Sequence, residues 1–347
     1  MITTLAPYQR CLFFGLLLLA FTGHTKAQPS MNPFHIAGHA QGTTYHITYY
    51  APDSIVTQRQ TDSILNSIDS SLSIYKPYSL ISRFNNSTRG LRMDRMLRTV
   101  VERSLEIYQE TSGISDITVA PLVDAWGFGT KRIEDIPSSD AIAQLMPCIG
   151  SDKLRIRGDS LIKITPCVRI DVNGIAQGYS VDIVADFLER MHIADYLVEI
   201  GGEIRVKGGH GTSGQKMSIG IESPSDDGFS QPPMRKVIFL DHGAVTTSGN
   251  YRKYYEAGGK KISHLIDPKT GYPFQNEMIS VTVLAKDAIT ADGYDNALMG
   301  MGLKKAMNFV AAKKDMEAYF IYHKPDGAVA DTASAGFDKL LTLASTP

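Results

Sequence analysis

Residues 168–182 read Val-Arg-Ile-Asp-Val-Asn-Gly-Ile-Ala-Gln-Gly-Tyr-Ser-Val-Asp and predict a strand that runs into a helix. Apolar residues alternate up to Val172, and from Gly174 to Arg190 they recur at helical spacing. Asp171 lies at the end of the strand, and two glycines frame the start of the helix. Backbone groups at such a junction can bind a phosphate or a metal-bound phosphate, although the same glycines would also serve a plain turn.

The rest of the chain alternates helical and strand patterns without repeats or long linkers. Apolar residues at helical spacing predict helices over residues 64–74 and 97–108. Segments rich in β-formers predict strands over residues 43–50, 197–200, 216–221 and 237–240. We expect residues 223–233 to form an exposed connection, because strand patterns resume directly on both sides. This mixture, with hairpins between helices, favours an α+β fold over a doubly wound sheet.

Composition excludes one class of partner. A chain of 347 residues, 43% hydrophobic and 20% charged, can bury a substantial core in one large domain or two smaller ones. Its 35 Lys and Arg against 36 Asp and Glu give a formal charge of -1. Binding to a nucleic-acid backbone needs a basic excess or a basic face, so no nucleic-acid partner is expected.

The N-terminus has the pattern of a signal peptide covering residues 1–27. Arg10 precedes an apolar run over residues 11–21, and small residues then lead to a cleavage site before Gln28. The run is too short for a membrane span of roughly 20 residues, so we expect an exported, periplasmic protein with no stable span after cleavage. The alternative is an uncleaved segment that retains the protein at the inner membrane.

Cys148 and Cys167 flank a segment whose alternating arms and Gly158-Asp159 turn predict a β-hairpin over residues 154–164. The hairpin would bring its two flanks together. In an oxidising compartment the cysteines would form a disulfide, and the alternative is two separate buried thiols. Their spacing suits no zinc motif.

Three further constellations have the residue types of a reactive site. Residues 197–202 (Leu-Val-Glu-Ile-Gly-Gly) predict either a close approach of a flat ring or phosphate, or only a tight bend. His264 and Asp267 precede a proline-containing turn, where the histidine would carry a proton or be a satisfied residue beside the turn. Asp292 and Asn296 are four apart, so on a helix both oxygens would face one Mg²⁺, unless Asp292 is an N-cap.

Eight motifs, taken in order, resemble those of the ApbE-type FAD:protein FMN transferases. They are Gln41-Gly-Thr-Thr-Tyr45, Ser73–Asn85, Ala120–Gly129, Asp171–Asp182, Ile200–Gly202, Thr247–Gly249, His264–Pro273 and Ala291–Ala297. The resemblance covers residues 41–302. It implies a single large α+β domain over residues 28–347, ApbE-like and T-fold-like, with mixed sheets and surrounding helices.

The resemblance also implies the ligands and the residues that hold them. FAD would contact nine positions, with its rings on Tyr75 and Trp126: Gln41, Tyr75, Ala125, Trp126, Gly127, Phe128, Asp171, Gln177 and Ile266. Mg²⁺ would lie at the pyrophosphate, held by Gly174, Asp292, Asp295 and Asn296.

The implied reaction moves the FMN half of FAD onto a threonine or serine of an acceptor protein and releases AMP. His264 would take the hydroxyl proton. The implied acceptors are the flavinylated subunits of sodium-pumping NADH:quinone oxidoreductases and Rnf-type complexes. Two alternatives remain open: an FAD pyrophosphatase that releases FMN and AMP, and a flavin-binding protein without catalysis.

The chain departs from the family pattern at three positions. Gln41 replaces a methionine, which would alter packing against the flavin. Gln177 replaces a lysine, which removes a positive charge near the phosphates and would weaken FAD binding. Asn296 replaces a threonine and still offers an oxygen, while Asp295 would add a second carboxylate if it turns inward. Either arrangement suits Mg²⁺ and also calcium.

Overall fold

The computed structural model describes residues 30–130, 136–222, 234–250, 254–257 and 260–343. The predicted signal peptide (residues 1–27) and the predicted connection over residues 223–233 lie outside these ranges. Within them, no helix is long and apolar enough to cross a membrane.

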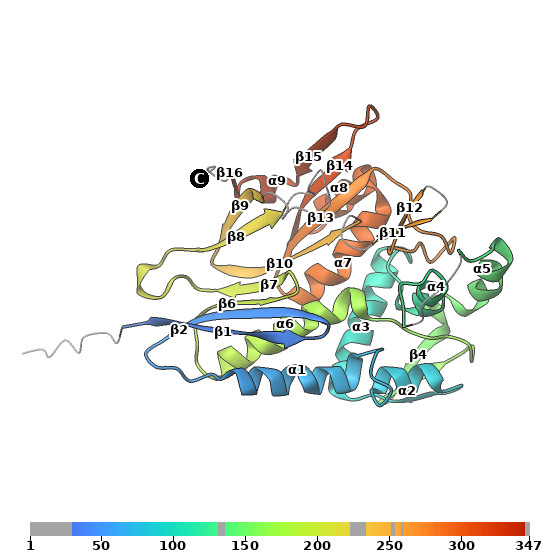
Figure 1. Cartoon of the computed structure of the whole chain (residues 1–347), viewed down its shortest axis with the longest axis horizontal. Helices are drawn as coiled ribbons and strands as arrows, with labels where there is room; N and C mark the ends of the chain where they lie inside the picture. Colours follow the sequence, from blue (N-terminus) through green and yellow to red (C-terminus); the bar gives the residue numbers. More distant parts are fainter. Residues whose placement is uncertain (1–29, 131–135, 223–233, 251–253, 258–259, 344–347) are drawn as a thin grey trace, which may run out of the picture.

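An eight-stranded sheet forms the centre of the molecule, in the order β1-β2-β6-β7-β10-β13-β14-β15 (Figure 1). Each neighbouring pair in it is antiparallel. Its strands are β1 Asn32–Ala40, β2 Thr43–Ala51, β6 Asp195–Ile200, β7 Glu203–Lys207, β10 His242–Gly249, β13 Met278–Ala285, β14 Met316–His323 and β15 Val329–Ala333. The strands predicted over residues 43–50 and 197–200 are adjacent here, and Tyr45 pairs with Ile200.

Helices cover one face of this sheet and share its core: α1 Gln58–Leu72, α2 Leu80–Asn86, α3 Arg95–Glu110, α6 Asn173–Arg190, α7 Ala288–Met301 and α8 Leu303–Ala311. The helices α4 Ala120–Ala125 and α5 Ser139–Leu145 pack in a separate apolar cluster. The short helix α9 Ala335–Asp338 lies on the opposite face, where Phe337 packs against Tyr319. N-cap side chains define where three of the larger helices begin. The side chains of Thr57, Asp94 and Asp287 each accept a hydrogen bond from a backbone N–H in the first turn of α1, α3 and α7, respectively. The predicted helices over residues 64–74, 97–108 and 174–190 correspond to α1, α3 and α6.

A small sheet of β8 Met217–Glu222, β9 Met234–Leu240 and β16 Leu341–Leu343 covers the opposite face. β14 shows the two layers, because its side chains alternate between them. Ala318 and Phe320 pack in the core on the helical side, whereas Tyr319 and Ile321 pack in the core toward the small sheet. The predicted α+β domain is confirmed, and its main sheet is buried on both faces.

The predicted hairpin and the predicted disulfide between its flanks are confirmed. β4 Leu154–Arg157 and β5 Ser160–Lys163 pair across Gly158, and β3 Gly90–Arg92 joins them. Cys148 and Cys167 form a disulfide, with their Cα atoms 5.4 Å apart. A further hairpin pairs β11 Tyr254–Ala257 with β12 Lys260–Ser263.

The strand predicted to end at Val172 is wrong. The segment before α6 is not part of any strand. The side chain of Asn85 replaces a strand partner, because its Oδ1 accepts from the N–H of Ile170 over 2.7 Å and its Nδ2 donates to the carbonyl of Ile170 over 2.8 Å. The N–H of Asp171 donates to the carbonyl of Ile117 over 2.7 Å. The β-branched residues of this segment predicted a strand. Its backbone groups instead form hydrogen bonds with residues distant in the sequence.

Candidate functional site

Two helices meet at the candidate site and run in opposite directions. Gly178 of α6 is glycine because a Cβ there would lie 2.2 Å from the carbonyl oxygen of Ala288 and 2.7 Å from Cβ of Asp292. The close approach lets the N–H of Gly178 donate to Oδ2 of Asp292 over 2.7 Å. One turn earlier on α6, Gly174 faces Asn296, which is one turn later on α7.

A cavity of about 330 Å³ opens beside this helix pair, within the size range of small-molecule sites. Its wall brings together most of the residues predicted from sequence. They are Tyr75, Phe128, Asp171, Gly174, Gln177, His264, Ile266, Asp292, Asp295 and Asn296. These residues come from segments far apart in the chain, and Tyr75 is 59% exposed at the wall.

Four predicted FAD-contacting residues do not line this cavity: Gln41, Ala125, Trp126 and Gly127. Trp126 is a core residue, because only 4% of it is exposed and its Nε1 donates to the carbonyl of Gly271 over 2.8 Å. Its ring therefore does not offer the stacking face that we expected. Gln41 lies in the tight turn after β1, and its Nε2 donates to the hydroxyl of Ser180 over 2.9 Å.

A cluster of oxygen atoms lies on the α7 side of the cavity. Asp292 is inside the helix and not at its start, so the N-cap alternative is wrong; the cap is Asp287, which accepts from the N–H of Thr290 over 3.1 Å. Oδ1 of Asn296 accepts from the hydroxyl of Ser248 over 2.6 Å. Asp295 turns inward, 2% exposed, and its Oδ1 has no hydrogen-bond partner within the described residues.

Gly174 supplies a candidate backbone ligand. An N–H at position 178 of a regular α-helix would donate to the carbonyl of residue 174. The N–H of Gly178 donates to Asp292, and Gly174 departs from helical geometry at φ -88 and ψ 21. The carbonyl of Gly174 is therefore a candidate ligand for a cation beside Asn296.

The donor set fits Mg²⁺. Carboxylate, amide and backbone carbonyl oxygens are the ligands that hard cations prefer. Within the described ranges, no group of three or more His, Cys, Asp and Glu side chains is arranged to hold a metal. The candidate site has only two carboxylates, Asp292 and Asp295, and would depend on the oxygens of Gly174 and Asn296 as well.

The cavity wall is acidic. Five carboxylates line it, and among the described lining residues there is no Lys or Arg: the acids are Asp116, Asp171, Glu203, Asp292 and Asp295. Burial raises the pKa of Asp292, and the charge of Asp182 adds to this shift while the N–H of Gly178 opposes it. Burial also raises the pKa of Asp295, and the charges of Asp292 and Glu203 add to it. A phosphate anion would be repelled here unless a cation came with it.

His264 lines the cavity next to Phe128, and their ring centroids are 6.2 Å apart with the planes at 67°. Asp267 has a separate role. Its carboxylate accepts from the N–H of Lys269 over 2.8 Å and from the hydroxyl of Thr270 over 3.1 Å, which builds the turn that follows. Since Asp267 is absent from the cavity wall, His264 is the member of this motif that faces a ligand.

Comparison with known proteins establishes the family. The sequence profile of the ApbE family matches residues 41–320. The chain belongs to the ApbE family. It is 36% identical to the FAD:protein FMN transferase of Haemophilus influenzae over 343 residues, which cover 95% of this chain and 98% of that protein. It is 37% identical to the FAD:protein FMN transferase of Vibrio cholerae over 315 residues, covering 89% and 92%.

Solved ApbE structures share the fold. The flavin transferase ApbE from Vibrio cholerae superposes with a TM-score of 0.80 at 35% identity, covering 89% of this chain and 99% of that one. The apo form of the Pseudomonas stutzeri flavinyl transferase ApbE gives a TM-score of 0.79 at 33% identity, covering 90% and 97%. The ApbE-like fold expected from the motifs is thus confirmed.

The substitution of Gln177 for the usual ApbE lysine has a visible consequence. Its Nε2 donates to the carbonyl of Ile200 over 2.8 Å and to Oε2 of Glu203 over 2.6 Å. A Cβ on Gly201 would lie 1.9 Å from this nitrogen, and Gly201 has a φ of +60. The paired glycines therefore form a tight bend, and Gly201 also lines the cavity. The close approach of a ring or phosphate to this bend stays a prediction.

Sequence reasoning missed several cavity residues of this ApbE protein. Glu203 directly follows the paired glycines, and that position was the available signal for it. Ser248 belongs to a Thr-Ser-Gly motif that we recognised without giving its serine a role. Phe274 lines the wall from beyond the His264 motif, and no spacing in the sequence indicated it.

Proposed function

We propose that the chain is an FAD:protein FMN transferase, which transfers the FMN half of FAD to a threonine or serine of an acceptor protein and releases AMP. Membership in the ApbE family supports the reaction class. The observation that carries the proposal is a single cavity wall with an aromatic ring, Tyr75, a histidine, His264, and the oxygen cluster of α7. Such a cavity suits a flat ring joined to a pyrophosphate.

The flavin would bind through the apolar and polar residues away from α7. Tyr75 offers an exposed ring for stacking, and Phe128 and Ile266 supply apolar wall. Asp171 is fixed for contact with the nucleotide, because its Oδ1 accepts from the N–H of Asn173 over 2.8 Å. Gln177 holds the bend at Gly201 close to the same cavity and adds no charge.

The oxygen cluster would hold Mg²⁺ at the pyrophosphate. Its members would be the Gly174 carbonyl, Asp292, Asp295 and Asn296. When bound there, Mg²⁺ would supply positive charge to the phosphate oxygens, which gain charge as the phosphorus–oxygen bond breaks. The absence of Lys and Arg from the described wall supports this need for a cation.

His264 would take the proton of the acceptor hydroxyl. The hydroxyl oxygen forms a bond to the FMN-side phosphorus, the bond from that phosphorus to the bridging oxygen breaks, and AMP leaves with the electron pair. Imidazole is the side chain best suited to carrying a proton near neutral pH. Phe128 against its ring limits how His264 turns.

The partners and location follow from the same proposal. The acceptors would be exported domains of membrane-bound redox subunits, resembling those of sodium-pumping NADH:quinone oxidoreductase and Rnf complexes. The N-terminal pattern of residues 1–27 supports export to the periplasm. A membrane-retained form would keep this segment uncleaved.

Product chromatography tests the proposal. Purified protein is incubated with FAD and Mg²⁺, with and without an acceptor domain, and the free nucleotides are separated. We expect AMP to form only when the acceptor is present. We expect no free FMN, because the FMN would be bound covalently to the acceptor. Equal amounts of free FMN and AMP without acceptor would instead establish a pyrophosphatase, and unchanged FAD a binding protein.

A further inference from the structure

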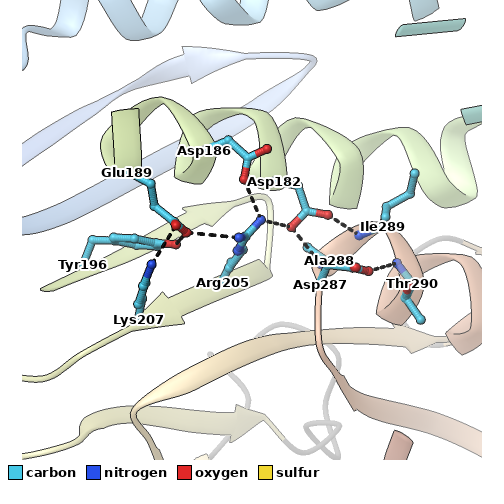
Figure 2. Close-up of polar contacts among 10 residues, drawn as sticks. All are labelled: Asp182, Asp186, Glu189, Tyr196, Arg205, Lys207, Asp287, Ala288, Ile289 and Thr290. Atoms are coloured by element: carbon cyan, nitrogen blue, oxygen red, sulfur yellow. Dashed lines mark hydrogen bonds and ion pairs between the residues drawn. The ribbon is translucent and has the colours of Figure 1, made fainter. Parts of the chain in front are cut away.

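A buried carboxylate from α6 closes the N-terminal end of α7. Asp182 accepts from the N–H of Ala288 over 3.0 Å through Oδ1 and from the N–H of Ile289 over 2.8 Å through Oδ2 (Figure 2). N–H groups of a first helical turn have no partner within the helix. The negative charge of Asp182 also lies at the positive end of the dipole of α7. This contact therefore fixes both the position and the direction of the helix start.

Arg205 of β7 holds that carboxylate in place. Its Nη1 lies 3.0 Å from Oδ1 of Asp182, and the two side chains are only 19% and 9% exposed. Figure 2 shows Arg205 between Asp182 and Glu189, with Asp186 above it. The ion pair thus joins α6, the main sheet and the first turn of α7, and removing either partner would leave a buried charge without its counter-charge.

The capped end and the oxygen cluster belong to one row of contacts between the two helices. Positions 182, 178 and 174 of α6 oppose positions 288, 292 and 296 of α7. Each step is four residues, or about one helical turn, on both helices. Because α7 is stiff, a shift or rotation at Ala288 would move Asp292 and Asn296 relative to Gly174.

We propose that Asp182 and Arg205 are positioning residues for the metal site, which set the register of α7 on α6 so that the oxygens of Gly174, Asp292 and Asn296 converge. This proposal rests on the proposed function, since it assumes that the oxygen cluster binds the cation. It assigns a role to two residues that do not line the cavity. Partners that orient metal ligands change metal affinity by about 10–100-fold when mutated.

Asp186 is a matched control. It lies on the same helix, and its Oδ1 is 3.1 Å from the same Nη1 of Arg205. It is 48% exposed, and its ion pair with Arg205 joins α6 to β7 without involving α7. Asp186→Asn removes one carboxylate from Arg205 without changing the contact to α7. Asp182→Asn removes a carboxylate from the same Arg205 and also one of the acceptors for the α7 N–H groups.

The experiment measures the binding of Mn²⁺, which serves as a probe of the Mg²⁺ site. Electron paramagnetic resonance gives the Kd for Mn²⁺ on FAD-loaded protein without acceptor. We expect Asp182→Asn to raise the Kd for Mn²⁺ about 10–100-fold and Asp186→Asn to change it less than about 3-fold. The Kd for FAD in EDTA should stay within about 3-fold for both. The slower FMN transfer of Asp182→Asn should recover at saturating Mg²⁺, which a general loss of folding would not do.

The outcomes separate the two proposals. If wild-type protein binds no Mn²⁺ specifically, the metal site itself is wrong. If wild-type protein binds Mn²⁺ but Asp182→Asn binds it equally well, or if both variants weaken it equally, the positioning role is overturned. If thermal melting shows that Asp182→Asn is unfolded, Arg205→Lys replaces it as the test variant. That variant keeps the positive charge but loses the planar guanidinium group. An unchanged Kd for Mn²⁺ in Arg205→Lys overturns the proposal.

Discussion

The main-chain N–H of Gly178 donates to Oδ2 of Asp292 over 2.7 Å, although 114 residues separate them in the sequence. This bond joins the two helices that carry the candidate metal ligands. It occupies Oδ2 of Asp292 and leaves Oδ1 for a cation. The site therefore depends on close contact between two helix backbones as much as on the side chains.

Gly178→Ala should destabilise the protein, because the new Cβ would lie 2.2 Å from the main-chain oxygen of Ala288. We expect a loss of about 1–3 kcal/mol in the free energy of unfolding, measured by urea denaturation. Gly293→Ala is the control. Its Cβ would meet the end of the Ile107 side chain at 2.4 Å, which can move, so the change should stay within about 1 kcal/mol. Equal losses would show that close backbone packing is not what Gly178 provides.

Substitution of Trp126 should affect stability, whereas substitution of Tyr75 should affect FAD binding. Trp126→Phe loses the hydrogen bond to the buried carbonyl of Gly271, which should cost about 1–3 kcal/mol of stability and change the Kd for FAD less than about 3-fold. Tyr75→Ala removes an exposed ring at the cavity and should weaken FAD binding about 3–10-fold with little effect on stability. Fluorescence titration and thermal melting measure the two properties. A large FAD effect from Trp126→Phe would return that ring to the binding site.

His264→Ala should slow FMN transfer by roughly 10²-fold or more while leaving the Kd for FAD unchanged. The reason is the loss of the group that takes the hydroxyl proton. His242→Ala is the control, since His242 is 87% exposed and does not line the cavity. Single-turnover rates with FAD and acceptor measure the effect, and a wild-type rate for His264→Ala would remove this residue from the mechanism.

Divalent-cation removal should stop transfer and weaken FAD binding. Without a cation, no positive side chain on the described cavity wall would offset the charge of the pyrophosphate, since that wall has five acids and no Lys or Arg. We expect EDTA to abolish transfer and added Mg²⁺ to restore it, with Asp292→Asn requiring a higher Mg²⁺ concentration than wild-type protein. Rates measured over a series of Mg²⁺ concentrations test this. Transfer at an undiminished rate in EDTA would contradict the metal proposal.

Local sequence patterns predicted the elements whose contacts are local. The hairpin over residues 154–164 follows from its own alternation and turn, and the disulfide between its flanks follows from the hairpin. The spacing of Asp292 and Asn296 also sufficed, because residues four apart share one face of a helix.

Features created by distant partners could not be predicted in this way. The segment before α6 was taken for a strand, since nothing in its sequence shows that Asn85 supplies its hydrogen bonds. Trp126 was predicted to stack on a ring of FAD, but it is buried and donates to the carbonyl of Gly271, 145 residues away. The cap of Asp182 on α7 joins residues 106 and 107 apart in the same manner. Such contacts follow from tertiary packing and not from local preference.

Intact-mass spectrometry of an acceptor domain tests the central proposal most directly. The acceptor is incubated with this protein, FAD and Mg²⁺, beside matched reactions that lack FAD or contain EDTA, and a variant acceptor in which the target threonine is alanine. We predict a gain equal to one FMN that requires FAD, the divalent cation and the threonine. An acceptor of unchanged mass, while FAD is consumed or remains bound, would contradict the assignment as an FMN transferase.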